Sequence, residues 1–156
     1  MTELKHPNHF KLEAFCKAFS LKDAESMNQI YHEKATFSDP VFKDLPPGEV
    51  KKMWRLLCSR GKDLTIDFRV IEADDHNGKA EWTARYTFSG TGKKVVNRIQ
   101  SRFDFVEGKV VAQQDEFDFY AWARQAFGLK GLFFGWMPWF KQKVCKGAMT
   151  GLNRYH

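Results

Sequence analysis

The stretch Ala-Glu-Trp-Thr-Ala-Arg-Tyr-Thr-Phe at residues 80–88 decides the fold. Polar side chains alternate along it with apolar ones, which are Ala80, Trp82, Ala84, Tyr86 and Phe88. Successive side chains of a β-strand point to opposite faces of its sheet. The alternation therefore predicts a strand that buries one face and exposes the other.

The same period of two continues on both sides of this stretch. It predicts strands over residues 64–70, 80–88, 95–106 and 109–119, with short turns such as Glu107-Gly108 between them. Sequential strands with short connections form an antiparallel meander, because each hairpin turn reverses the chain.

Upstream of the strands the periodicity is helical. Asn8 is predicted to cap a first helix, and Ser20–Asp23 has the pattern of a capping box that opens a second helix, with Tyr31 on its buried stripe. Further helices are predicted over residues 49–59 and 120–127. The buried face of the first helix is predicted to hold Phe10, Ala14, Phe15, Ala18 and Phe19.

Helices followed by four long strands predict an α+β domain. A few helices that cover one apolar face of a twisted sheet leave a concavity, and ligands bind in concavities. We therefore expect one domain over residues 1–156, in which the N-terminal helices wrap a curved antiparallel sheet into a cone with a pocket. Residues 119–156 are expected to form an aromatic, basic C-terminal extension of it.

Cysteine and histidine usage gives no sign of a bound group. The three cysteines, Cys16, Cys58 and Cys145, are scattered and odd in number, which argues against a disulfide framework and a zinc site. The five histidines, which include His156, do not cluster with carboxylates at ligand spacing. We expect no metal and no cofactor. The N-terminus MTELKHPNHF has no basic stretch followed by an apolar run, so we expect a cytoplasmic protein.

The net charge of +6 is unevenly distributed along the chain. Residues 1–118 contain 19 basic and 19 acidic side chains, whereas the residues after Asp118 contain six Lys or Arg and no acid. A basic domain can bind nucleic acid, but here the body is neutral and no nucleic-acid-binding motif is present. We expect no nucleic-acid partner.

On the strand over residues 95–106, Ile99, Phe103 and Phe105 are predicted to face inward. Asn97 and Ser101 have the same parity and face inward with them. Such polar groups need partners, because burying one without a hydrogen bond costs about 1–3 kcal/mol.

On the last strand, Val111 and Phe117 are predicted to face inward, which carries Gln113 and Asp115 to the same side. Together with Asp39 they give a polar cluster inside an apolar pocket. The predicted catalytic residues are Asp39 and Asp115. The predicted ligand-binding residues are Phe15, Tyr31, Trp54, Trp82, Tyr86, Asn97, Ser101, Gln113 and Phe117.

Simpler interpretations compete with these. Asp39 precedes a proline, and such a carboxylate is typical of turns, where it accepts nearby backbone N–H groups. Asn97, Ser101 and Gln113 could bond to one another or to a trapped water. Asp115 could lie at a bulge and be solvated.

The segment Glu-Lys-Ala-Thr-Phe-Ser-Asp-Pro-Val at residues 33–41 resembles the motif around the general-base aspartate of ketosteroid isomerases. The order of elements over residues 8–119 also resembles the nuclear-transport-factor-2-like superfamily to which those enzymes belong. The runs at residues 96–105 and 114–118, with Trp122-Ala-Arg, are similar to bacterial members of its SnoaL-like group.

The resemblance carries over only part of the isomerase site, which uses an aspartate base with a tyrosine and a protonated aspartate as hydrogen-bond donors. Asp39 matches the base, and Tyr31 matches a second-helix tyrosine of that family. The donor tyrosine falls at Phe15, which cannot donate, and the protonated aspartate falls at Ser101. Steroid isomerisation by that mechanism is therefore not expected, because an enolate needs donors where its charge develops.

Two functional hypotheses follow. In the first, the protein is an isomerase, hydrolase or cyclase that acts on a hydrophobic substrate, with Asp39 or Asp115 as general base, because burial raises the pKa of a carboxyl group towards neutrality. In the second, the protein binds a ligand without catalysis or serves as a protein-interaction module. A cavity filled by Phe15, Trp54 and Trp82 would argue against both.

Two further expectations concern assembly. We expect a homodimer formed through the outer sheet face or the C-terminal tail, since superfamily members are often dimers. Within the tail, Leu129, Leu132, Phe133, Phe134 and Trp136 are predicted to fold back and close the open end of the sheet. The alternative, not favoured by the sequence, is contact of these aromatic residues and the neighbouring lysines with an anionic membrane surface.

Overall fold

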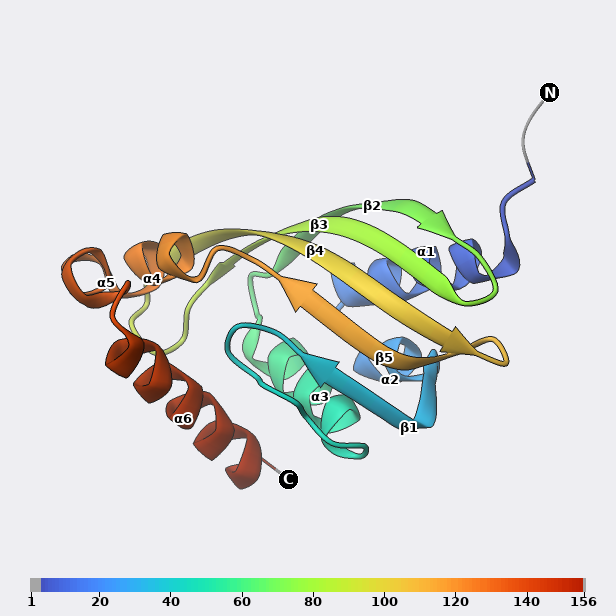
Figure 1. Cartoon of the computed structure of the whole chain (residues 1–156). Coiled ribbons are helices and arrows are strands. Elements are labelled where there is room, and N and C mark those ends of the chain that lie inside the picture. Colours follow the sequence, from blue (N-terminus) through green and yellow to red (C-terminus); the bar gives the residue numbers. More distant parts are fainter. Residues whose placement is uncertain (1–3, 156) are drawn as a thin grey trace.

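The computed structural model describes residues 4–155, so residues 1–3 at the start of the N-terminal stretch and His156 lie outside it (Figure 1). The helices are α1 Pro7–Ser20, α2 Ala24–Asn28, α3 Glu49–Arg60, α4 Phe119–Phe127, α5 Leu129–Phe134 and α6 Pro138–Arg154. The strands are β1 Tyr31–Ser38, β2 Thr65–Ala73, β3 Asn77–Thr87, β4 Lys94–Val106 and β5 Lys109–Glu116.

The five strands form one curved, open sheet in the order β1-β5-β4-β3-β2. Strands β2 to β5 are an antiparallel meander, as predicted from the alternation. Glu107 and Gly108 join β4 to β5 with φ angles of 51° and 75°, the pair of positive φ values that a tight hairpin turn requires. The α+β fold expected from the sequence is confirmed.

The edge strand β1 differs from the prediction. Tyr31 was expected on the second helix and only residues 35–38 were expected to be β-like, but α2 ends at Asn28 and Tyr31 begins an eight-residue strand. Strand β1 pairs parallel with β5, so the sheet is mixed and not wholly antiparallel. Asp23, not Ser20, caps α2, because its carboxylate accepts the Ser26 N–H at 3.1 Å.

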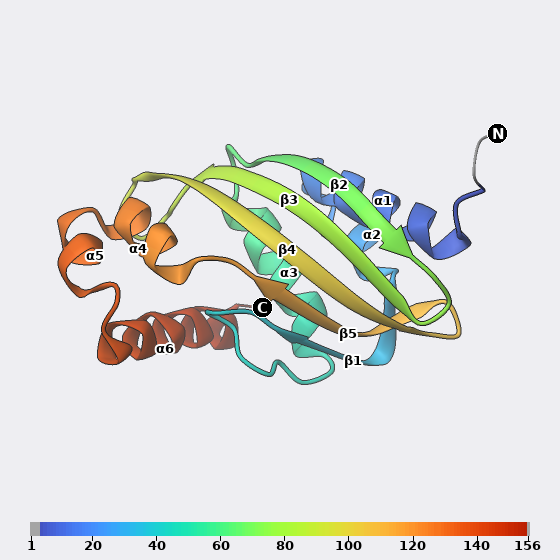
Figure 2. The same ribbon diagram turned by 45° about the horizontal axis from the view of Figure 1, so that its top comes forward.

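Helices α1, α2 and α3 lie on one face of the sheet, and no described helix covers the other face (Figures 1 and 2). The main apolar core fills the space between these helices and the inner face of the sheet. A second apolar cluster lies where α4 and α6 meet the start of β4, around Val95, Trp122 and Phe140. These two clusters share a boundary, and the candidate site lies along it.

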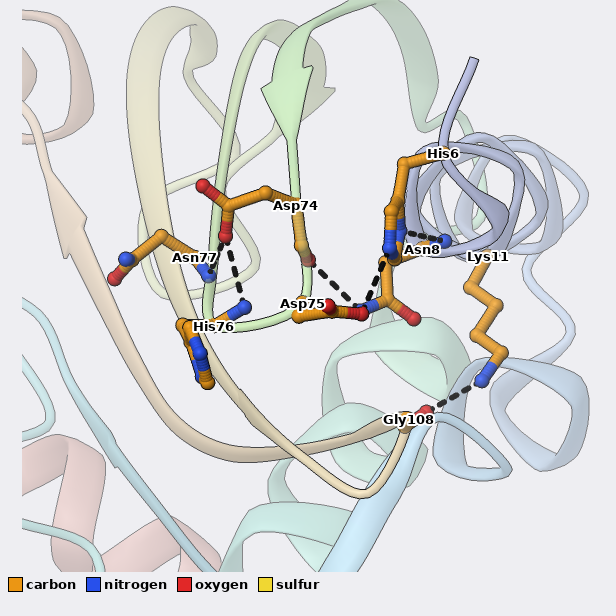
Figure 3. Close-up of polar contacts among 8 residues, drawn as sticks. All are labelled: His6, Asn8, Lys11, Asp74, Asp75, His76, Asn77 and Gly108. Atoms are coloured by element: carbon orange, nitrogen blue, oxygen red, sulfur yellow. Dashed lines mark hydrogen bonds and ion pairs between the residues drawn. The ribbon is translucent and has the colours of Figure 1, made fainter. Parts of the chain in front are cut away.

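The first helix is tied to two hairpin turns of the sheet (Figure 3). His6, not Asn8, is its N-cap, because the His6 ring accepts the Asn8 N–H at 3.0 Å. The Asn8 side chain is buried and donates to the Asp74 carbonyl at 2.9 Å, while Lys11 donates to the Gly108 carbonyl at 2.6 Å. The asparagine therefore anchors α1 to the β2–β3 turn and does not cap it.

The buried face of α1 is also rotated from the predicted one. Phe10 is 55% exposed and Ala14 is exposed, whereas Leu12 and Cys16 are buried beside Phe15. The five predicted positions span too wide an arc for one helix face, and the sheet selects part of it.

A bulge in β5 corrects the prediction for Val111. Phe105 pairs with Val110, while Asp104 pairs with Ala112, so Val111 is an extra residue in the ladder. Val110 is fully buried in its place. Beyond the bulge the predicted parity holds.

The tail does not fold as predicted. Its glycines and Pro138 do divide it into α4, α5 and α6, but Leu129, Leu132, Phe133, Phe134 and Trp136 are all exposed. The second apolar cluster is instead closed by Phe119, Trp122 and Ala126 of α4 with Phe140 of α6. Gly131 is the residue of α5 that is buried against α4, so the large side chains of α5 point away from the body.

Candidate functional site

The inner face of the sheet carries the polar residues that strand parity placed there. Burial alternates along all thirteen residues of β4, and Asn97 and Ser101 are 8% and 1% exposed. On β5, Gln113 and Asp115 are each 3% exposed, so Asp115 is not a solvated residue at a bulge. Buried polar groups of this kind are kept only where hydrogen bonds compensate for lost water.

A buried polar network joins six side chains across the main core. The Trp54 indole donates to the Tyr31 hydroxyl at 2.7 Å, and that hydroxyl donates to the Gln113 carbonyl oxygen. From the other side, the Trp82 indole donates to the Ser101 hydroxyl at 2.7 Å. Both arms of the network converge on the Asp115 carboxyl group. Its members are Trp54, Tyr31, Gln113, Asp115, Ser101 and Trp82.

Asp115 receives both arms of the network on a single oxygen. The Ser101 hydroxyl donates to Oδ1 at 2.6 Å, and the Gln113 amide donates to the same atom at 3.0 Å. No group among residues 4–155 donates to Oδ2. Burial raises the pKa of Asp115 to about 7, although these two hydrogen bonds oppose the rise. A carboxyl group held through one oxygen, with the other free and a pKa near neutrality, can give or take a proton.

Asp39 follows the last pair of the parallel β1–β5 ladder, Ser38 with Gln114, and its charge contributes to the raised pKa of Asp115. Its Oδ1 accepts the backbone N–H groups of Val41 and Phe42 at 2.7 and 2.6 Å. The turn expected as the simpler interpretation is therefore present. The residue is partly exposed, but its carboxyl group is buried, and burial raises the pKa of Asp39 to about 6 against those two hydrogen bonds.

Five residues mark the boundary between the two apolar clusters, which we call the seam: Asp39, Val41, Tyr86, Asn97 and Phe117. Val41, Tyr86 and Phe117 pack against both clusters and stay partly exposed. The charge on Asp39 contributes to a raised pKa of Tyr86, after burial as the main cause, which places the carboxylate near this phenol. The seam thus combines partly exposed apolar side chains with polar groups.

Two hydrogen-bonding groups at the seam are open. The Tyr86 hydroxyl accepts the Trp122 indole N–H at 2.8 Å, and its own proton has no acceptor within the described part of the chain. Asn97 is 8% exposed, and its side-chain amide makes no hydrogen bond with any described residue. Buried amides and phenols are normally paired, so both are candidates to bind a polar atom of a ligand.

The deep end of the predicted pocket is filled by aromatic side chains. Phe15 packs edge-on against Trp54 with ring centroids 5.7 Å apart, and Phe19 packs against both Trp54 and Trp82 at 5.1 and 5.2 Å. A cavity filled by Phe15, Trp54 and Trp82 was expected to argue against both functional hypotheses, and these side chains do fill the deep end. Phe15 and Trp54 lie in the core, whereas Val41, Tyr86 and Phe117 at the seam stay partly exposed.

Two hollows of about 730 and 740 Å³ lie on the outer face of the sheet, not on the inner one. Charged side chains such as Arg102, Asp104, Arg98 and Glu81 line them. Neither hollow includes Asp39 or Asp115. The inner pocket stays a prediction, as do the catalytic and ligand-binding roles.

Sequence reasoning missed Trp122, which holds the Tyr86 hydroxyl. It was assigned to the tail, yet its spacing contained the signal. Phe119, Trp122, Ala123 and Ala126 follow the i, i+3, i+4, i+7 pattern of a helix with one buried face. Within residues 4–155 no group of three or more His, Cys, Asp or Glu side chains is arranged to hold a metal ion.

The polar network predicts a measurable stability effect at Tyr31. Replacing Tyr31 by Phe removes the hydroxyl that pairs both the Trp54 indole and Gln113. It leaves a buried donor and a buried acceptor unsatisfied, so the free energy of unfolding should fall by about 2–3 kcal/mol. Urea denaturation measures this change.

The matched control is Tyr120→Phe, which removes a single exposed hydrogen bond to the Leu132 carbonyl and should cost under about 1 kcal/mol. Equal losses in the two variants would show that the network contributes nothing beyond an ordinary hydrogen bond.

Comparison with known proteins gives a family and a fold. The family model described as a SnoaL-like domain matches residues 12–113. A search of curated proteins found no match. An LEH-like epoxide hydrolase of M. tuberculosis is 19% identical, with a TM-score of 0.61, over 81% of this chain and 92% of its own.

Two further solved structures show the same fold. TerC, co-crystallised with polyporic acid, is 18% identical with a TM-score of 0.65, over 79% of this chain and 100% of its own. A protein from Catenulispora acidiphila with a ketosteroid isomerase-like fold, in complex with trimethylamine, is 9% identical. Its TM-score is 0.61, and the match covers 75% of this chain and 92% of that one. Identities this low establish the architecture only.

Proposed function

This chain belongs to the SnoaL-like domain family, and we propose that it binds a hydrophobic small molecule at the seam and transfers a proton to or from it through Asp115. The family and the fold support small-molecule binding. The carboxyl groups of Asp115 and Asp39 support the acid–base chemistry.

One observation carries the proposal, namely the state of the Asp115 carboxyl group. Its Oδ1 is held by Ser101 and Gln113, its Oδ2 accepts no hydrogen bond from the described residues, and its pKa is about 7. A purely structural buried aspartate is expected to have both oxygens paired. A general acid or base works best with a pKa near the operating pH and one oxygen free for the substrate.

Asp39 supplies the second carboxyl group of the proposed site. Its pKa of about 6 lies below that of Asp115, and the Asp39 charge is one cause of the raised pKa of Asp115. Two adjacent carboxyl groups with different pKa values favour a state in which one is ionised and the other protonated. In that state Asp39 is the base and Asp115 is the acid.

The open Tyr86 hydroxyl and Asn97 amide would orient the substrate. Both can donate to a substrate oxygen, which makes them candidate donors where charge develops. Isomerase, hydrolase and cyclase reactions all remove a proton at one atom and deliver a proton at another. We keep all three as candidate reactions for this chain. The name of the epoxide hydrolase neighbour agrees with the second of them.

A non-catalytic ligand-binding function is the second candidate. It is favoured by the filled deep end, where Phe15 replaces a hydrogen-bond donor, and by the use of Asp39 Oδ1 in the turn. The two candidates share the seam and differ in whether Asp115 moves a proton.

The test begins with a thermal-shift screen of hydrophobic ketones, epoxides and quinones against the wild-type protein. Compounds that raise the melting temperature are then incubated with wild type, Asp115→Asn and Asp104→Asn, and their conversion is followed by chromatography. Asp104 is the matched control, since it is exposed on the outer face of β4. Asp115→Asn should lower turnover by about 10²–10⁴-fold with little change in the thermal shift.

The outcomes are distinct. Turnover by Asp115→Asn at the wild-type rate would contradict the role of this carboxyl group. Binding without any conversion by the wild type would support the non-catalytic candidate. A screen in which no compound raises the melting temperature would argue against a ligand at the seam.

A further inference from the structure

Six large apolar side chains are exposed within eleven residues of the tail. Leu129, Leu132 and Phe133 of α5 are 71%, 43% and 61% exposed. Phe134, Trp136 and Trp139 are 41%, 66% and 51% exposed. We call these six residues the aromatic patch. They lie on α5, in the turn that follows it and at the start of α6, at the end of the molecule opposite the start of α1 (Figures 1 and 2).

The fold holds the aromatic patch outward. Gly131 packs directly on the α4 backbone, so a side chain in its place would overlap the Ala123 carbonyl. The opposite side of α5 must then face away from the body. The Trp136 indole donates to the Phe133 carbonyl at 3.0 Å, and the rings of Phe134 and Trp139 lie 5.7 Å apart. Residues of the patch therefore also contact one another.

The charged side chains of the tail are all of one sign. Every charged side chain after Asp118 is basic, namely Arg124, Lys130, Lys141, Lys143, Lys146 and Arg154. None of the nine salt bridges formed by residues 4–155 includes any of them. Lys93, in the β3–β4 turn, adds a further positive charge next to Gly128. A partner for this surface must offer negative charge and accept aromatic rings.

We propose that the aromatic patch docks the protein on the surface of an anionic lipid bilayer. Tryptophan and phenylalanine enter the boundary between headgroups and acyl chains, and the surrounding lysines attract acidic headgroups. No helix in the described part of the chain is long and apolar enough to cross a membrane. The docking is peripheral and reversible, and it weakens as salt screens the charges.

The same charges disfavour a second copy of this chain as the occupant. A two-fold dimer places the same patch of each copy against the other. The unpaired lysines of both copies would then face each other, and like charges across an interface are repulsive. A lipid surface that contains phosphatidylserine removes this conflict.

Co-sedimentation with vesicles tests the proposal. Wild type should sediment with vesicles of phosphatidylcholine that contain roughly a third phosphatidylserine, and not with pure phosphatidylcholine. Phe133→Ser with Trp136→Ser should lower the bound fraction about tenfold or more, because both exposed rings are removed. Phe10→Ser is the matched control, because Phe10 is 55% exposed on α1 at the other end of the molecule.

A charge variant tests the electrostatic contribution to vesicle binding independently. Lys130→Gln with Lys143→Gln should weaken binding to the anionic vesicles several-fold, and raised salt should do the same to wild type. Lys17→Gln with Lys43→Gln removes the same charge elsewhere on the exposed surface and should change binding less.

Three results would overturn the proposal. The first is wild type that stays in the supernatant with anionic vesicles at low salt. The second is a Phe133→Ser, Trp136→Ser variant that binds like wild type. The third is light scattering that shows a wild-type dimer which dissociates in this variant, without vesicle binding, and so assigns the patch to a second copy.

Discussion

Replacing Asp115 by Asn is expected to abolish most of the loss of stability that the wild-type protein shows as the pH rises from about 4 to about 7. Burial raises the pKa of Asp115 from the ordinary 3.8 to about 7 in the folded protein. Between these values the folded state holds the proton and the unfolded state has released it. The free energy of unfolding therefore falls with rising pH across this window and levels off above it.

The size of the effect follows from the shift in pKa. Each pKa unit corresponds to about 1.4 kcal/mol, so a shift of about three units gives a loss on the order of 4 kcal/mol by pH 8. Asp39, whose pKa is about 6, adds a change of the same sign. The carboxyl groups whose pKa values are lowered, such as Asp63 and Asp74, act only at lower pH, where protonation removes their stabilising hydrogen bonds.

Asparagine is the right replacement because its carbonyl oxygen can still accept from Ser101 and Gln113. Urea denaturation from about pH 4.5 to about pH 8.5 should show a variant that is close to wild type at the acid end and several kcal/mol more stable at the alkaline end. Asp104→Asn, on the outer face, should follow the wild-type curve. Parallel curves for wild type and Asp115→Asn would mean that Asp115 titrates normally and is not buried as described.

The sequence was sufficient to predict the inner face of the sheet, because a period of two is a local property. Burial of Ser101 and Asn97 followed from their parity with Ile99, and no tertiary information was needed. Gln113 and Asp115 were placed correctly even though Val111 was not, because the bulge lies before them in the strand. A bulge adds one residue to the ladder without a clear mark in the sequence.

Contacts between distant segments could not be read from local patterns. The parallel pairing of β1 with β5 joins residues about eighty positions apart, and it alone brings Asp39 next to Asp115. The Trp122–Tyr86 hydrogen bond, which completes the seam, has the same origin. The tail shows the limit most clearly, because apolar residues there were expected to be buried. Composition cannot tell a core from an exposed patch when one close helix contact decides the orientation.

The contact of Gly131 with the backbone of α4 gives the second large prediction. Replacing Gly131 by Ala should lower the free energy of unfolding by about 3 kcal/mol. A Cβ at this position would lie 1.9 Å from the Ala123 carbonyl oxygen and 2.8 Å from the Arg124 nitrogen. Both are backbone atoms in the middle of α4, so neither can move without breaking that helix. Helix α5 must instead shift away from α4, and the aromatic patch moves with it.

Gly147→Ala is the matched control, because it makes the same chemical change within α6, where a Cβ would meet nothing within 4 Å. It should raise the free energy of unfolding by about 0.5–1 kcal/mol, since alanine loses less backbone entropy in a helix. Urea denaturation of both variants gives the comparison. A Gly131→Ala protein that gains stability as Gly147→Ala does would show that α5 does not rest on α4 in solution. The outward orientation of the aromatic patch would then lose its structural cause.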